Sequence, residues 1–419
     1  MSKHNHHHHS LLLSTLLLLS LSLLSPTTQS DYQQQEDTPI TRFQKYLRIN
    51  TAATTFLTTF SASIPNLTIQ LLHLTTPQKP LLLTLLGSNP SLPSILLNSH
   101  LDSVPTEPNK WSHPPFSAFH SPDGKIFAGG AQDDKCIGLQ YLEAIKNRVK
   151  DSSFKPLRTI HVSYVPDEEI GGLDEMAKFV KSDVFNGLNV GFVLDVEFRV
   201  FYADRTPWNL VIRAGGMPGH GSRMFDNSAM ENLIKSVEVV GKFRENQFDL
   251  VKAGLAANSE VVSVNPVYGF VMNMQPSEAE AGFDVRLPPT TDPDLLKRRI
   301  ADEWAPATRN MTYGITEKVP IRDYKGRPLM TPTDDSNPWW SLLITAAGGK
   351  LAKLEILPST TDARFTREMG IPTLGFSPMK YTPILLHDHN EFLKDTVYLV
   401  GIKVYEALIK SLSSSEGGS

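Results

Sequence analysis

The pair His100 and Asp102 is the first place where residue types and spacing could support catalysis. Both lie in segment 98–105, directly after an apolar run at 95–97 that is typical of a strand. Active sites in open α/β sheets form beyond the carboxyl ends of strands, and positions i and i+2 of an extended chain share a face. His100 therefore fits a metal ligand whose ring Asp102 orients. For these two residues alone, a hydrogen-bonded loop pair is the alternative.

Asp133 stands in a glycine-bearing loop, 129–135, just before a predicted helix at 134–148. A carboxylate carries two acceptor oxygens, so Asp133 could bridge two metal ions. For Asp133 or Asp134 taken alone, a helix N-cap is the alternative.

Three consecutive acids, Asp167, Glu168 and Glu169, follow a predicted strand at 159–165. Adjacent carboxylates repel one another unless a positive group compensates. Because successive side chains diverge in an extended chain, one of Glu168 and Glu169 can bind metal while the other faces the substrate as a general base. An isolated charge run of this kind would be a solvated turn.

His387 and His389 form a fourth cluster, in segment 385–391 before the last predicted helix. Alone, either would be a surface or capped histidine. Together the four clusters supply nitrogen and oxygen donors at predicted strand ends or loops, which suits catalytic zinc or a similar divalent ion. The chain has a single cysteine, Cys136, which excludes a zinc site built from several cysteines.

Strands that alternate with helices must position these residues, and they predict an α/β fold with a mixed-sheet catalytic domain flanked by helices. Before residue 205 we expect strands at 67–74, 81–86, 95–97, 159–165 and 190–194, and helices at 38–49, 134–148 and 173–181. After it the order becomes β-α-β-β-α-β, with strands at 210–213, 260–264, 279–287 and 310–315 and helices at 227–248 and 293–303. That order is typical of a small α+β unit of the ferredoxin-like kind.

The α/β pattern returns after about residue 325, with helices at 338–347 and 391–412. We therefore expect a discontinuous catalytic domain, 31–205 and 323–412, interrupted by a smaller inserted domain at 206–322. The tail 413–419 is predicted to be disordered.

Residues 1–30 are typical of a secretory signal peptide. Their apolar run, 11–24, is shorter than the about 20 residues of a membrane span. We expect cleavage near 25–31, entry into the secretory pathway and no membrane association afterwards; an uncleaved anchor is the alternative. With 40 basic and 44 acidic residues, the net charge of -4 argues against a nucleic-acid partner.

Five ordered motifs resemble those of the aminoacylase-1 family, a dinuclear-zinc group of aminoacylases and carboxypeptidases. The motifs are Ser99-His100-Leu101-Asp102, Gly130-Ala131-Gln132-Asp133, Pro166-Asp167-Glu168-Glu169-Ile170-Gly171-Gly172, Pro218-Gly219-His220-Gly221-Ser222 and Leu386-His387-Asp388-His389. The resemblance spans roughly 38–410. It implies zinc-dependent hydrolysis of N-acyl-L-amino acids to a carboxylate and a free L-amino acid. It also implies two zinc ions per subunit and a homodimer in which the inserted domain is a lid and dimerisation unit.

The resemblance assigns roles to individual residues. The implied metal ligands are His100 and Asp133 for one ion, and Glu169 and His387 with the bridging Asp133 for the other. Asp102 would orient His100, and Glu168 would be the general base and acid.

The resemblance also implies contacts with the substrate. His220 would reach a reacting carbonyl in the site of the partner subunit. Asn273 and Arg286 would hold the substrate carboxylate, with Arg364 as a further helper, because a guanidinium binds a carboxylate through two hydrogen bonds. A surface arginine on a strand is the alternative for Arg286.

The chain departs from the family pattern where a further metal ligand, a glutamate, is expected. Val196 occupies that position and has no donor atom. Asp195 and Glu197 are the candidate replacements, although both point away from the direction of residue 196. We assign Asp195 as the fifth metal ligand.

Two further departures bear on activity. Gly130 and Asp134 stand where the family has arginine and methionine, and the chain is shorter before Val200 and near 267–270. The alternatives to an aminoacylase are therefore a related metal-dependent carboxypeptidase or dipeptidase, and a catalytically impaired homologue that persists as a dimeric binding protein.

Overall fold

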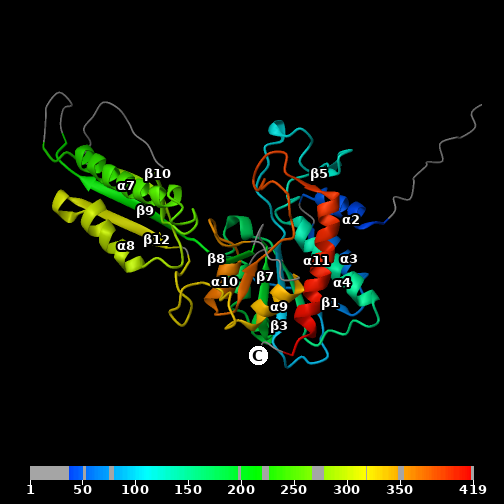
Figure 1. Ribbon diagram of the computed structural model, residues 1–419. Helices are drawn as coiled ribbons and strands as arrows, with labels where there is room; N and C mark the ends of the chain where they lie inside the picture. The colour runs from blue at the N-terminus through cyan, green and yellow to red at the C-terminus, as the bar shows by residue number, and fades with distance from the viewer. Residues whose placement is uncertain are drawn as a thin grey trace, which may run out of the picture. The chain divides into compact units, whose positions relative to one another are not determined.

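The computed structural model describes residues 37–50, 53–74, 80–196, 200–218, 226–266, 278–317, 319–347 and 353–416 (Figure 1). The predicted signal peptide at 1–30 lies outside the described residues. None of the described helices combines the length and apolar composition that a membrane crossing requires.

A mixed eight-stranded sheet is built from segments on both sides of the predicted insertion. In spatial order its strands are β1 (Leu67–Leu71), β2 (Leu81–Leu85), β6 (Ile160–Val165), β3 (Ser94–His100), β7 (Val190–Asp195), β14 (Thr373–Gly375), β8 (Val200–Asp204) and β13 (Leu354–Leu357). The central strands β6, β3, β7 and β14 run parallel, whereas β1 with β2, β2 with β6, and β14 with β8 pair antiparallel. The predicted α/β class with a mixed sheet is confirmed.

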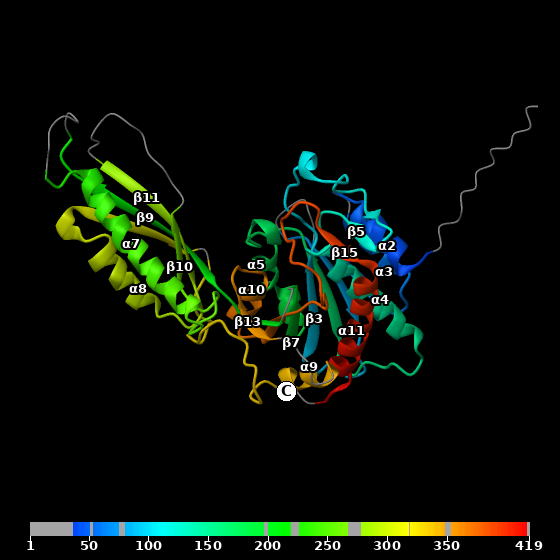
Figure 2. The same cartoon turned by 45° about the horizontal axis from the view of Figure 1, so that its top comes forward.

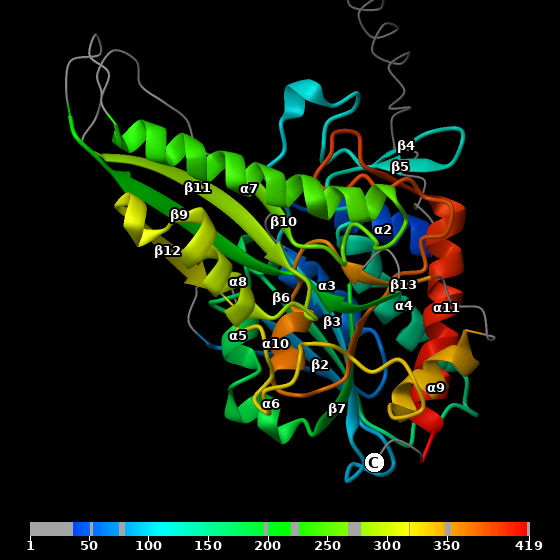
Figure 3. The ribbon, with the colours of Figure 1, turned by 60° about the vertical axis from the view of Figure 1, so that its left-hand side comes forward.

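Helices cover both faces of this sheet (Figure 3). On one face α4 (Lys135–Lys150) packs against α11 (Asp395–Ser414), and on the other lie α5 (Met176–Phe179), α6 (Asp183–Gly187) and α10 (Ala363–Glu368). Every residue of β3 and β6 is buried, which explains their continuous apolar runs. The remaining elements are α2 (Pro39–Leu47), α3 (Ala53–Ala62), η1 (Pro108–Lys110), η2 (Glu168–Ile170), α9 (Pro338–Ala346), and a small sheet of β15 (Phe392–Lys394), β5 (Lys125–Phe127) and β4 (Phe119–His120).

A separate four-stranded antiparallel sheet lies in segment 206–317, in the spatial order β10-β11-β9-β12. Its elements are β9 (Thr206–Gly215), α7 (Ala229–Lys252), β10 (Ser263–Pro266), β11 (Glu278–Leu287), α8 (Pro293–Arg299), the π-helix η3 (Ile300–Trp304), η4 (Ala307–Arg309) and β12 (Met311–Glu317). Helices α7 and α8 cover one face of this sheet (Figure 2), where Leu233 and Leu296 pack with Trp208 and Val285. The succession of elements is the predicted β-α-β-β-α-β.

The C-terminal segment differs from the prediction. Residues 392–394 form strand β15 instead of the start of a helix, and α11 ends at Ser414 instead of 412. Ser413 is fully buried and its carbonyl accepts the backbone N–H groups of Leu157 and Arg158, so the predicted disordered tail does not begin at 413. Residues 417–419 lie outside the described part of the chain.

Candidate active site

His100 ends β3 at the carboxyl edge of the sheet, and its ring lies between two carboxylates. Its Nε2 is 3.0 Å from Oδ1 of Asp133, and its Nδ1 is 3.0 Å from the backbone oxygen and 3.4 Å from Oδ1 of Asp102. The Asp102 carboxylate also accepts the backbone N–H groups of Glu168 (3.2 Å) and Glu169 (3.0 Å). Asp102 therefore joins the ends of β3 and β6 and sets the orientation of the imidazole.

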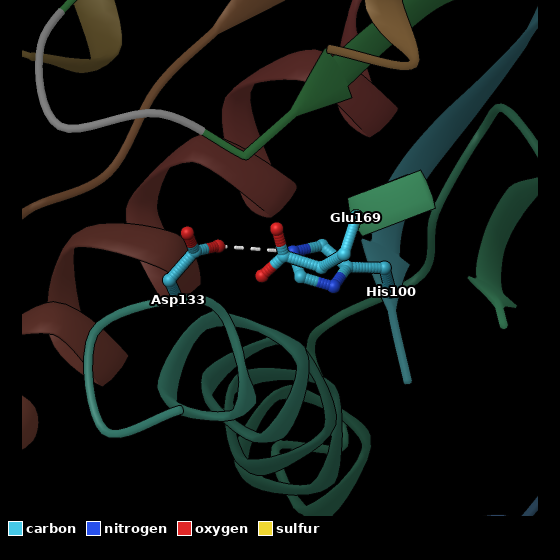
Figure 4. Close-up of side chains that lie close together, drawn as sticks. All are labelled: His100, Asp133 and Glu169. Carbon is cyan, nitrogen blue, oxygen red and sulfur yellow. Dashed lines mark hydrogen bonds and ion pairs between the residues drawn. The ribbon is translucent and has the colours of Figure 1, made fainter. Parts of the chain in front are cut away.

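Asp133 spans two imidazoles with its two oxygens. Oδ1 faces His100, and Oδ2 lies 3.4 Å from Nε2 of His387. The same His387 nitrogen is 2.9 Å from Oε2 of Glu169. Donor atoms of His100, Asp133 and Glu169 all lie within 4.8 Å of one another, and Figure 4 shows these side chains converging. This arrangement matches a bridging carboxylate between two cation positions.

Glu391, which the sequence analysis assigned no role, holds the loop that carries Asp133. Its carboxylate accepts the backbone N–H groups of Gly130 (3.0 Å), Gln132 and Asp133 (3.2 Å). Gly130 has a φ of 79°, a left-handed conformation that favours glycine. The sequence signal was its place next to the histidine cluster, directly before β15.

Asp134 is fully buried and has a structural role that the sequence did not reveal. Its carboxylate accepts the Ser99 hydroxyl (2.8 Å) and the His100 backbone N–H (3.0 Å) instead of capping α4. These hydrogen bonds link the start of α4 to the end of β3, next to the His100 imidazole.

The charges of the cluster shift several pKa values. Burial opposes protonation of His100, but Asp134, Asp102 and Asp133 together raise its pKa well above the usual value. Hydrogen bonding to Asp133, with the charge of Glu169, raises the pKa of His387 to about 9. Without a metal ion, both imidazoles therefore carry an extra proton, and a divalent ion would displace that proton when it binds.

Glu168 and Glu169 have raised pKa values. Burial raises the pKa of Glu168 well above the usual value, and the nearby Asp362 and Asp133 charges add to this shift. Burial and the Asp133 charge raise the pKa of Glu169 to about 6. Asp362, for which no role is predicted from the sequence, is 1% exposed, and neither of its carboxylate oxygens has a hydrogen-bond partner among the described residues.

A pocket of about 390 Å³ opens beside the cluster. It is lined by His100, Asp133, Glu168, Glu169, Gly171, Asp195, Val196, Arg286, Leu357, Ser359, Thr360, Thr361, Arg364, Leu386 and His387. The structure thus brings Arg286 and Arg364 to the same pocket as the cluster. Arg364 donates from Nη2 to the Gly171 carbonyl (2.5 Å), and the Nε of Arg286 is 3.1 Å from Asp284. His220, Asn273 and Glu197 lie outside the described residues.

Asp195 ends strand β7 at this pocket, and Val196 follows it. Asp195 Oδ1 accepts Nδ2 of Asn98 (3.0 Å), and Asn98 in turn accepts the Ser163 hydroxyl (2.5 Å). The other oxygen, Oδ2, is buried and has no partner in the described part of the chain. The side chain of Val196 brings no donor to the pocket. The nitrogen and oxygen donors of the cluster nevertheless fit a divalent metal.

Comparison with known sequences identifies the family. The sequence model of Peptidase family M20/M25/M40 matches residues 96–411. The chain is 39% identical to Aminoacylase-1 of Mus musculus over 402 residues, which cover 91% of this chain and 97% of the relative. It is 37% identical to Aminoacylase-1 of Dictyostelium discoideum over 415 residues, with 91% and 99% covered.

Solved structures share the fold at low sequence identity. The aminopeptidase PepT from Bacillus cereus superposes with a TM-score of 0.66 at 16% identity, over 90% of this chain and 98% of that one. The Bacillus subtilis YXEP protein, a dinuclear metal binding peptidase of the M20 family, has a TM-score of 0.60 at 13% identity, with 89% and 97% covered. From the family match and the full-length likeness to aminoacylase-1 proteins, the chain belongs to the M20/M25/M40 peptidase family.

Proposed function

We propose that this protein is a metal-dependent amidohydrolase that converts N-acyl-L-amino acids to a carboxylate and a free L-amino acid. The observation that carries the proposal is the Asp133 carboxylate between His100 and His387, with Glu168 lining the same pocket. The aminoacylase-1 relatives, which align over almost their whole length, support this substrate class.

Two zinc ions are the proposed cofactors. His100 and Asp133 would hold one ion, and Asp133, Glu169 and His387 the other, with Asp195 as a candidate fifth ligand. When bound, such ions would lower the pKa of a shared water molecule and polarise the scissile carbonyl. Asp102 would keep Nδ1 of His100 protonated so that Nε2 faces the ion.

Glu168 is the proposed proton carrier. Its pKa is raised by burial, and it lines the pocket next to Asp133. It would take a proton from the attacking water and later give it to the leaving amine. His220, which lies outside the described residues, is proposed to donate a hydrogen bond to the oxyanion in the site of the partner subunit.

Arg286 and Arg364 are the proposed partners of the substrate carboxylate, with Asn273 beside them. Both guanidinium groups line the pocket, and Nε of the buried Arg364 has no hydrogen-bond partner among the described residues. A free donor of this kind suits a carboxylate ligand. This end of the pocket would fix the amino-acid part of the substrate.

The decisive experiment measures hydrolysis of N-acetyl-methionine by zinc-loaded protein and by Glu168→Gln. We expect turnover in the wild type and at least a 100-fold loss in Glu168→Gln, with unchanged zinc content. Glu107→Gln, an exposed carboxylate nearby, is the control and should keep full activity. Turnover that survives in Glu168→Gln would remove that residue from its role.

Two further substrates separate the alternatives. Cleavage of dipeptides or of C-terminal residues in preference to acyl amino acids would favour a carboxypeptidase or dipeptidase. Absence of any hydrolysis in protein that holds its metal would favour the non-catalytic homologue.

We also propose a homodimer. Helix α7 exposes an apolar row, Ile234, Val237 and Phe248, at 50%, 37% and 49%, and such a row on one side of a helix suits contact with a second copy. Light scattering should give twice the chain mass for the wild type and a smaller mass for Ile234→Lys with Val237→Lys. A monomeric wild type would contradict this proposal.

The secretory pathway remains the proposed location, on the strength of the apolar run at 11–24. Mass spectrometry of protein produced in a eukaryotic host should find an N-terminus near 25–31.

A further inference from the structure

We infer that the two metal positions of this site are unequal: the Asp133–Glu169–His387 position binds tightly, and the His100–Asp133 position binds weakly. The inference rests on the proposed function for the presence of metal. It concerns the number of donors that this particular chain offers to each position.

The first position has three donors from the described chain. Oδ2 of Asp133 and Oε2 of Glu169 lie 3.4 Å and 2.9 Å from the same nitrogen of His387, so both carboxylates contact one imidazole. Three protein ligands are the usual complement of a catalytic zinc ion. Two of these three are carboxylates, whose charge favours a divalent cation.

Among the described residues, the second position has two donors, His100 and Asp133, because Glu169, the other acid within 4.8 Å of them, contacts His387. Nε2 of His100 lies 3.0 Å from Oδ1 of Asp133. Strand β7 ends at the same pocket, and Val196, the residue that follows it, lines the pocket without a donor atom. Glu168 also lines the pocket, but it is the proposed proton carrier and is not free to serve as a permanent ligand.

Asp195 does not replace the missing donor in this structure. Its Oδ1 is engaged by Asn98, which Ser163 holds in place. Its Oδ2 is buried and has no hydrogen-bond partner among the described residues. Among the described residues, the donor atoms that lie within 4.8 Å of one another belong to His100, Asp133 and Glu169, and Asp195 is not part of this group.

The expected difference in affinity follows from the donor count. Loss of an outer hydrogen-bond partner of a ligand already lowers metal affinity by about 10–100-fold. A missing direct ligand should cost at least the upper value. We therefore expect two zinc dissociation constants that differ by at least about 100-fold.

The test counts zinc on metal-free protein by calorimetry and by competition with a chromophoric chelator. The wild type should bind one ion tightly and a second at least 100-fold more weakly, and should keep one ion per chain after gel filtration. Val196→Glu should convert the second ion to tight binding, whereas the matched control Val196→Leu should not. Asp195→Asn should leave both zinc dissociation constants within about threefold of their wild-type values, because the Asp195 carboxylate faces Asn98.

Two tight ions of similar affinity in the wild type would overturn the inference, whether Asp195 or Glu197 supplied the donor. A fall to one tight ion in Asp195→Asn would identify Asp195 as that donor. If Val196→Glu does not fold, as judged by circular dichroism, the wild-type count still decides. Metal counts need no turnover, so unequal sites without hydrolysis would refute only the proposed activity, and hydrolysis with two equal sites would refute only this inference.

Discussion

At the scale of single residues, the site depends on carboxylates that each serve two partners. Asp133 faces His100 with one oxygen and His387 with the other. Asp102 orients the His100 ring and also holds the backbone of Glu168 and Glu169. Such shared acceptors place ligands from distant segments at one point with few residues.

Metal binding should depend on pH because protonated ligands must lose their protons. The pKa of His387 is raised to about 9 by Asp133 and Glu169, so its imidazole stays charged at pH 7 in the metal-free protein. A raised pKa means that the proton is lost only as the pH approaches 9, so zinc affinity should rise from pH 6 to pH 9.

Calorimetry at pH 7 in buffers of different ionisation enthalpy should detect about one proton or more released per tight zinc ion. His113, a histidine outside the metal cluster, offers a matched control, because His113→Gln should release the same number of protons. Binding heats that do not depend on the buffer would contradict the prediction.

At the scale of elements, the packing of α4 against β3 holds the His100 imidazole in place. Gly138 of α4 lies so close to this strand that a Cβ there would meet the Ser99 hydroxyl at 2.4 Å and the Tyr164 ring at 2.8 Å. Ser99 is bonded to Asp134, which also holds the backbone of His100. A change in this helix therefore reaches His100 through two hydrogen bonds.

Gly138→Ala should lower the free energy of unfolding by about 1–3 kcal/mol, because the added methyl group overpacks the contact. Gly241→Ala in α7, where nothing lies within 4 Å of the added Cβ, is the control. That change should raise the free energy of unfolding by about 0.5–1 kcal/mol, since alanine favours a helix more than glycine does. Urea unfolding of both variants gives the two values, and equal effects would contradict this account of α4.

At the scale of the whole molecule, the proposed ligands come from four segments between His100 and His387. An ion that binds them links β3, the α4 loop, η2 and the segment before β15 in the folded chain only. Metal binding at these ligands would therefore be coupled to folding.

Removal of metal with a chelator should lower the melting temperature. Free zinc at 100 times its dissociation constant would add about 2.7 kcal/mol to the free energy of unfolding. Scanning calorimetry with and without the chelator measures the shift in melting temperature. The shift should be smaller in His387→Gln than in the wild type. An unchanged melting temperature would show that these residues hold no metal in the native protein.

Periodicity and motif spacing are local properties, so they were enough to predict the α/β class, the order of elements in the inserted segment and the cluster around His100, Asp133 and Glu169. Three other features became visible in the folded chain alone: Glu391 holds the Asp133 loop, Asp134 accepts a hydrogen bond from Ser99 instead of capping a helix, and Asp195 accepts one from Asn98. Each of these depends on hydrogen bonds across separate elements, and Glu391 lies 258 positions from Asp133. A buried carboxylate must find whatever donors the packed fold brings to it, and no local pattern specifies which donors those are.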